Sequence, residues 1–435
     1  MHDGIGMVEL LVGLPGMRVL SVVEGVDELV VRVETTAERA FCAECGTRAQ
    51  AQDRTTRSVR DLSCFGRPVR LDVIQRRWRC RESWCPARTW TEHVDVLDAT
   101  AVMTRRAGAE ACRQVGAHAR PVAQVAREFG VCWWTVMNAV IEHGSPLADD
   151  PDRVGVVTKL GVDETSFRAA RPGKATSYVT GLIDLDEHQM IDLVEGNAAG
   201  DLRGWCERAD PGWLARVEVV ATDLAESYRA GLSPHLDHAV RVADGFHVVR
   251  AGNRCMDKVR RRVQNETLGH RGRADDPLYR IRKILLTGSE RVTGTGVDRM
   301  LLGLRVGDPH DEVLGAWLAK ESVRDVYLTD DPAEAEVLLD KAISGCRADD
   351  VPEIRSLGET LARWRTEILA HHHTGASNGP TEGLNLLVKD VKRCGRGFKR
   401  FDHYRLRVLL RAGRPTWPHQ PTPPILRTPR PHQHA

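Results

Sequence analysis

Two pairs of closely spaced cysteines constrain the fold of this 435-residue chain more than any other feature. Cys42 and Cys45 stand in FCAECG, and Cys80 and Cys85 stand in RCRESWC. Two such pairs, separated by a strand-rich spacer, are typical of a structural zinc site in which four thiolates complete a tetrahedral shell. The second pair has four residues between its cysteines rather than two, and the alternative is four unligated thiols. We predict a structural Zn²⁺ ion at these four residues.

The rest of the composition indicates a globular protein inside the cell. The chain has 11 cysteines, an odd number, and its N-terminus lacks the basic segment and apolar run of a signal peptide. No stretch approaches the roughly 20 apolar residues of a membrane span. We therefore expect a cytoplasmic protein of roughly two to four domains, without a disulfide framework.

The segment that holds the cysteines is rich in arginine, because residues 54–81 contain nine arginines against two aspartates. Apolar and polar residues alternate through RPVRLDVIQRRWRC, which predicts a strand with one exposed face. We predict a DNA-contacting zinc ribbon over residues 38–100 and, before it, a β-hairpin over residues 1–37 with its turn near Gly25. The arginines of the ribbon expected to contact DNA are Arg76, Arg77 and Arg79.

The sequence RPVAQVAREFGVCWWTVMNAVIEHG, residues 120–144, has the spacing of a helix-turn-helix. Val125 and Ala126 would face inward, Gly130 would make the turn, and a second helix would follow. A tight pair of helices without a DNA role is the alternative, but the position after an arginine-rich segment favours DNA binding. We assign residues 101–150 to this motif. Its expected DNA-contacting side chains are Trp133, Trp134, Thr135 and Asn138.

From Val156 onward, buried strands alternate with short polar gaps. Three hairpin-like strands, a helix, a strand, a helix and a further strand follow in the order of an RNase H-like fold, which we assign to residues 151–250. Asp163, Asp223 and Asp244 are expected at the ends of the first, fourth and fifth strands. Because the first and fourth strands would be neighbours, Asp163 and Asp223 would meet at one edge of the sheet and could bind Mg²⁺. The alternative is that these aspartates are only helix caps or turn residues.

The remainder of the chain is mostly helical in pattern. Residues 251–370 predict an α-helical insertion, and residues 371–412 predict the final helix of the core. One face of that helix carries polar residues at i, i+3, i+7 and i+10, namely Glu382, Asn385, Lys389 and Lys392. An acid therefore begins a stripe that becomes basic, which is either a solvated face or a surface for a polyanion. The Pro-rich tail, residues 413–435, is expected to be disordered.

Together these features resemble the insertion-sequence transposases of the ISL-three family, which are DDE enzymes of the RNase H-like superfamily. The resemblance rests on the cysteine pairs, the helix-turn-helix and the stretches GVDETSF, TDLAESY, DGFHVV and SNGPTEGLNLLVKDVKRCGRGFKRFDHYRLR. By position, it implies that Asp163, Asp223 and Glu382 form the catalytic triad and hold Mg²⁺ or Mn²⁺.

The resemblance also implies roles for residues around the triad. Asp244 and His247 fall in the family's D-R-F-H motif, in which Gly245 here replaces the usual Arg. We expect Asp244, His247 and Asn385 to support the site. The basic residues after Glu382 are expected to contact DNA phosphates, and they are Lys389, Lys392, Arg393, Arg396, Lys399 and Arg400.

The implied fold is a multidomain α+β and α/β protein with an N-terminal zinc ribbon, a helix-turn-helix and an RNase H-like catalytic core interrupted by an α-helical insertion. The implied activity is binding of terminal inverted repeats, followed by metal-dependent strand cleavage and transfer. Double-stranded DNA would be the partner, and the protein would act as a homo-oligomer on DNA in the bacterial nucleoid. The alternative is a catalytically inactive, transposase-derived DNA-binding regulator, which would be expected to have lost a carboxylate of the triad.

Overall fold

The computed structural model describes residue 9, residues 12–98 and residues 100–418. The chain divides into two compact units, one formed by Met1–Arg153 with Arg414–Ala435 and the other by Val154–Gly413. Most of the predicted Pro-rich tail, residues 419–435, lies outside the described residues. None of the helices in the described ranges has the length and apolar character needed to cross a membrane.

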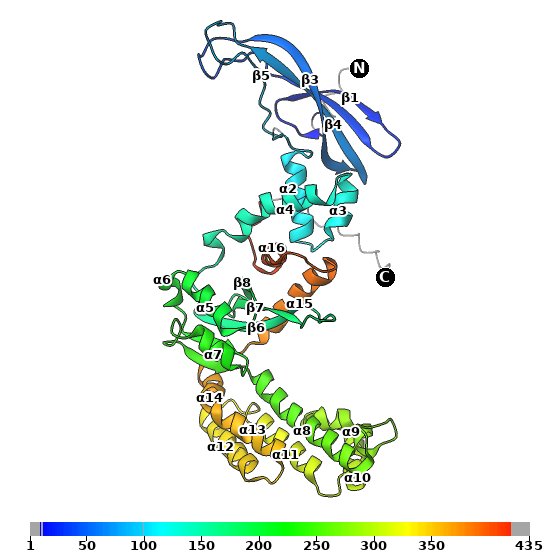
Figure 1. The fold of residues 1–435 in the computed structure, drawn as a ribbon, viewed down its shortest axis with the longest axis vertical. Helices are drawn as coiled ribbons and strands as arrows, with labels where there is room; N and C mark the ends of the chain where they lie inside the picture. Colours follow the sequence, from blue (N-terminus) through cyan, green and yellow to red (C-terminus); the bar gives the residue numbers. More distant parts are fainter. Residues whose placement is uncertain (1–8, 10–11, 99, 419–435) are drawn as a thin grey trace, which may run out of the picture. The chain divides into compact units, whose positions relative to one another are not determined.

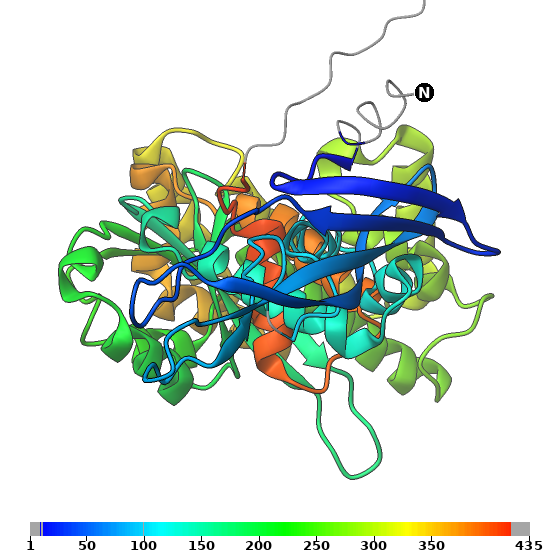
Figure 2. The ribbon, with the colours of Figure 1, turned by 90° about the horizontal axis from the view of Figure 1, so that it is seen from above.

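The first unit contains a five-stranded sheet. Its strands are β1 (Met17–Glu24), β2 (Leu29–Thr35), β3 (Gln50–Cys64), β4 (Arg67–Arg79) and β5 (Thr89–Thr91). The predicted hairpin is formed by β1 and β2, which run antiparallel and appear side by side in dark blue in Figure 2. Because β2 also pairs in parallel with β4, the hairpin and the strands of the cysteine segment share one sheet. The predicted alternation in β4 is confirmed, since Val69, Leu71 and Val73 are buried.

Three helices follow the sheet in the first unit, and they are α2 (Arg105–Gly116), α3 (Val122–Phe129) and α4 (Trp133–Ala148). A short 3₁₀ turn, η1 (Pro151–Arg153), comes after them. Gly130 ends α3 in the left-handed conformation, with φ at 65°, which favours glycine at this turn. Val125 and Ala126 are buried as predicted.

The second unit is built on another five-stranded sheet, with the order β10-β9-β6-β7-β8. Three of its strands, β6, β7 and β8, are labelled in Figure 1. Its strands are β6 (Lys159–Arg168), β7 (Ser177–Asp184), β8 (Gln189–Glu195), β9 (Val219–Thr222) and β10 (Val240–Ala243). β6, β7 and β8 are antiparallel, whereas β9 pairs in parallel with both β6 and β10. The connecting helices are α5 (Ala199–Arg208), α6 (Pro211–Leu214) and α7 (Glu226–Leu232). Leu160, Leu182 and Val220 belong to the core between this sheet and its helices.

A long helical segment follows β10 directly. Its elements are α8 (Gly245–Leu268), α9 (Pro277–Leu286), the 3₁₀ turn η2 (Ser289–Arg291), α10 (Gly294–Gly307), α11 (Glu312–Asp325), α12 (Pro332–Ala348), α13 (Pro352–Arg363) and α14 (Arg365–Thr374). These helices share a core of their own, which includes Met256, Leu339 and Ile368. The chain then returns to the sheet, where α15 (Gly379–Cys394) lies against β6 and α16 (Phe401–Ala412) lies against β8.

The segment after the helical region differs from the prediction in one respect. We expected one final helix over residues 371–412, but the structure has two, α15 (Gly379–Cys394) and α16 (Phe401–Ala412). The break has a local cause, since Arg396 and Gly397 both adopt positive φ angles, which an α-helix cannot continue through.

Candidate active site and zinc centre

Two aspartates from neighbouring strands meet in the second unit. The parallel ladder of β6 and β9 ends with the pair Val162 and Thr222; Asp163 is the next residue of β6, and Asp223 directly follows β9. Ligand atoms of Asp163, Asp223 and His247 all lie within 4.8 Å of one another. The predicted meeting of the two carboxylates at one edge of the parallel strands is therefore present.

The prediction that β6 ends at Asp163 was wrong. The strand continues to Arg168, because its other edge stays paired with β7. Asp163 lies opposite Gly181 in that antiparallel ladder. Only the parallel pairing of β6 with β9 ends before Asp163. Beyond that point no described strand pairs with β6 on the side of β9, which leaves room there for the carboxylates of Asp163 and Asp223.

His247 belongs to the acidic group itself rather than to its surroundings. It lies in the first turn of α8, and its Nε2 is 2.7 Å from Asp223 Oδ1 and 3.9 Å from Asp244 Oδ2. Asp244 is buried at the N-cap position of α8, and its Oδ1 accepts a hydrogen bond of 3.3 Å from the backbone N–H of Asn378. The start of α8 thus places the His247 ring against Asp223. It also places Asp244 where its carboxylate is hydrogen-bonded to Asn378, the residue before α15.

Helix α15 is attached to β6 by its polar stripe. Asn385 Nδ2 donates to Asp163 Oδ2 at 2.6 Å, and Asn385 Oδ1 accepts from Thr165 Oγ1 at 2.9 Å. Two turns further on, Lys392 Nζ donates to the Ser166 carbonyl at 2.6 Å. The stripe is therefore not simply a solvated face. Thr165 had not been singled out in the sequence, although its position two residues after Asp163 puts both on one face of β6.

Glu382 lies one turn before Asn385, in the first turn of α15, and its side chain is exposed. It shares the helix face of Asn385, which contacts Asp163. It is not a member of the group formed by Asp163, Asp223 and His247. The structure thus brings the helix that carries Glu382 to Asp163, through Asn385.

Electrostatics in this group favour a cation. Burial and the nearby charge of Asp223 raise the pKa of Asp163 to about 6. Burial also raises the pKa of Asp244. For His247, burial disfavours the charged ring, but the hydrogen bond and charge of Asp223 outweigh it and raise the pKa. Within the described residues, neither Asp163 nor Asp223 pairs with a Lys or Arg, and two carboxylates whose oxygens lie within 4.8 Å of each other fit a hard divalent cation such as Mg²⁺.

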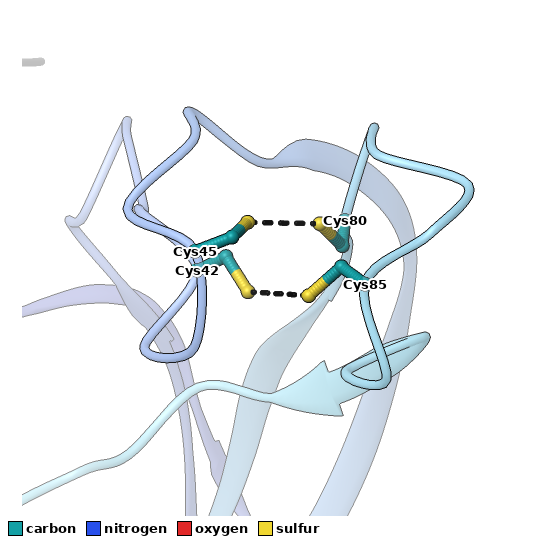
Figure 3. A group of neighbouring side chains, drawn as sticks. All are labelled: Cys42, Cys45, Cys80 and Cys85. Carbon is teal, nitrogen blue, oxygen red and sulfur yellow. Dashed lines mark hydrogen bonds between the residues drawn. The ribbon is translucent and has the colours of Figure 1, made fainter.

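The four cysteines of the first unit form a second group. Cys42 Sγ is 3.7 Å from Cys85 Sγ, and Cys45 Sγ is 3.6 Å from Cys80 Sγ (Figure 3). Disulfide sulfurs would be only about 2.05 Å apart, whereas tetrahedral Zn–S bonds of about 2.3 Å separate the sulfurs by about 3.8 Å. The observed spacing fits four thiolates around one Zn²⁺, and the two pairs come from two facing turns.

The residues predicted to contact DNA in the first unit differ in their surroundings. Arg77 pairs with Asp53 at 3.3 Å, and Arg76 is 4.0 Å from Glu34, whereas Arg79 is exposed. At the start of α4, Trp133, Trp134 and Asn138 are exposed, and Thr135 is partly buried.

The basic residues after Glu382 lie mostly at the surface. Lys389, Arg396 and Lys399 are exposed, whereas Arg393 pairs with Asp390 at 2.8 Å and Arg400 lies 3.4 Å from Asp402. Lys392 is bound to β6, as described above.

Comparison with known families decides the relationship. A family profile of ISL3-type DDE transposases, described as "Transposase", matches residues 160–408, more than half of the chain. The chain belongs to the ISL3 family of insertion-sequence transposases. A second profile, the zinc-finger of transposase IS204/IS1001/IS1096/IS1165, matches residues 38–85 of this ISL3 transposase. That range contains all four clustered cysteines.

Two curated relatives agree with this assignment. The ISL3 transposase is 25% identical over 386 residues to the transposase for insertion sequence element IS1001 of Bordetella parapertussis, which covers 87% of this chain and 90% of that protein. It is also 25% identical over 310 residues to the transposase for insertion sequence element IS1557 of Mycobacterium tuberculosis, covering 66% of this chain and 68% of that protein.

Proposed function

We propose that this ISL3 transposase cuts and joins DNA at the ends of an insertion sequence, with Asp163, Asp223 and Glu382 as its catalytic carboxylates. The observation that carries the proposal is the meeting of Asp163 and Asp223 where the parallel strands β6 and β9 end. The attachment of α15 to Asp163 through Asn385 supports the inclusion of Glu382.

The sheet supports an RNase H-like core. Three antiparallel strands followed in the sheet by two parallel ones, with helices between, give the order β8-β7-β6-β9-β10. In that arrangement the helices α8 to α14 interrupt the core before α15. The domain limits that we propose are those expected from the sequence, except that the helical insertion begins with α8 at Gly245, directly after β10, rather than at residue 251.

Asp163, Asp223 and Glu382 would hold Mg²⁺ or Mn²⁺. When bound, such ions supply activation of the attacking water or 3′-hydroxyl and stabilise the leaving oxygen. The other residues orient this group: Asn385 fixes one oxygen of Asp163, and His247 lies against Asp223. Thr165 in turn fixes the amide of Asn385.

Recognition of the element's ends would belong to the first unit. The four-cysteine group would hold Zn²⁺ and fix the ribbon, and α3 and α4 would act as a helix-turn-helix. Exposed Trp133, Trp134 and Asn138 and the exposed Arg79 are available to double-stranded DNA. Because two ends must be joined, we propose a homo-oligomer on DNA, acting at the bacterial nucleoid.

The catalytic assignment is tested by neutralising each carboxylate. Asp163→Asn, Asp223→Asn and Glu382→Gln should each lower Mg²⁺-dependent cleavage of a plasmid carrying the element's inverted repeats, by about 10²-fold or more. DNA binding by gel shift should persist. Glu195→Gln, which neutralises an exposed acid at the end of β8, is the matched control and should leave cleavage unchanged.

Two outcomes would contradict the proposal in different ways. Full cleavage by Glu382→Gln would remove Glu382 from the triad. Binding without any cleavage by the unaltered protein, over a range of Mg²⁺ and Mn²⁺ concentrations, would instead favour the DNA-binding regulator.

A further inference from the structure

Helices α8 and α13 pack against each other and leave a groove of about 410 Å³ between them. Both helices belong to the helical segment drawn in the lower part of Figure 1. Two cations of α8, Arg254 and Lys258, line the groove from one side, and Ser356 of α13 lines it from the other. All three side chains are exposed.

The groove continues the face of α8 that bears His247. Residues 247, 251, 254 and 258 are spaced by four, three and four, which places them on one side of an α-helix. At 1.5 Å per residue, Arg254 and Lys258 lie about 10 Å and about 16 Å along the axis from His247. A DNA strand advances about 3.4 Å per nucleotide, so this distance corresponds to roughly three to five nucleotides.

The charges in the groove are available to a ligand. On the same helix, Arg260 and Arg261 pair with Asp257, and Arg262 pairs with Glu353 at 2.8 Å. Glu353 also lines the groove, and its pairing with Arg262 compensates its charge. Within the described ranges, neither Arg254 nor Lys258 forms an ion pair with a carboxylate. The Ser356 hydroxyl likewise has no hydrogen-bond partner within those ranges.

We propose that the groove between α8 and α13 binds the sugar-phosphate backbone of the DNA strand that extends from the acidic group. Guanidinium, ammonium and hydroxyl groups are the usual phosphate ligands in protein–DNA contacts. The inference rests on the proposed function, because it requires DNA at Asp163 and Asp223. It gives the helical segment a role in holding substrate, a few nucleotides from the site of cleavage.

The test measures how DNA affinity depends on salt. Each phosphate contact that is lost lowers the slope of log K against log salt by about 0.9, so Arg254→Gln with Lys258→Gln should lower it by about two. The probe is a short mixed-sequence DNA duplex, titrated by fluorescence anisotropy between about 50 and 200 mM salt. Ser356→Lys adds a cation to the groove and should raise the slope by about one.

The matched control is Arg305→Gln with Lys341→Gln, which removes two exposed cations from α10 and α12 and leaves the slope unchanged. A photo-crosslinking residue at position 356 should attach to the duplex in the otherwise unaltered protein. An unchanged slope in the groove variant, an equal fall in the control, or no crosslink from position 356 would each overturn the inference while leaving the proposed function intact. Absence of any DNA binding by the unaltered protein would instead contradict the proposed function.

Discussion

At the scale of single residues, Gly245 shows how closely the start of α8 is packed against the helical segment. A Cβ on Gly245 would lie 2.8 Å from Tyr327 Cε1. Tyr327 follows α11, and its ring stacks on His372 with centroids 5.7 Å apart. An aromatic ring from the helical segment therefore occupies the space beside Asp244 that a side chain at position 245 would need.

This packing predicts that Gly245→Ala destabilises the protein. Overpacking of a filled site typically costs about 1–3 kcal/mol, which exceeds the gain of up to about 1 kcal/mol from replacing Gly by Ala in a helix. Chemical denaturation should show a lower free energy of unfolding, and a smaller loss when Tyr327→Ala is also present. Gly345→Ala in α12 is the control, because nothing lies within 4 Å of its added Cβ and it should not destabilise. Equal effects of the two alanines would refute the packing argument.

At the scale of elements, the sequence predicted those strands and turns whose causes are local. The alternation of β4, the turn at Gly130 and the strand endings at Asp223 and Asp244 follow from patterns within a few residues. The full extent of β6 did not, because it depends on β7 pairing beyond Asp163.

Contacts between distant segments were the other part that the sequence could not supply. Asn385 and Asp163 are 222 residues apart, so their hydrogen bond depends on how the helical segment returns the chain to the sheet. His247 joined the acidic group for a similar reason. Its ring reaches Asp223 only because α8 begins directly after β10, and that start fixes the rotation of the helix.

The four-cysteine group gives a prediction at this scale, because a zinc ion there would join the turn of Cys42 and Cys45 to the turn of Cys80 and Cys85. Cys42→Ser with Cys45→Ser removes two of four thiolates, so elemental analysis should find no stoichiometric zinc, and binding to the element's ends should weaken. Cys64→Ser with Cys394→Ser, two cysteines outside the cluster, should keep both zinc and binding. Unchanged zinc in the cluster variant would rule out this site.

At the scale of the whole molecule, the division into two compact units separates the two candidate metal sites. The cysteine group lies in the first unit, and the acidic group with Gly245 lies in the second. Multidomain chains commonly depart from two-state unfolding, and a metal that binds only the folded state stabilises the unit that holds it. We therefore expect calorimetry of the full chain to show two transitions.

The two transitions should respond to different perturbations. Chelation of zinc should lower the midpoint temperature of only one transition. Gly245→Ala should lower the midpoint temperature of only the other, by about 2–4 °C for each kcal/mol of unfolding free energy lost in a unit of this size. Cys42→Ser with Cys45→Ser should reproduce the effect of chelation without any chelator, which separates zinc loss from nonspecific effects of the reagent. A single transition that moves with both perturbations would mean that the units unfold as one, and the four-cysteine segment would then contribute to the stability of the sheet that carries Asp163.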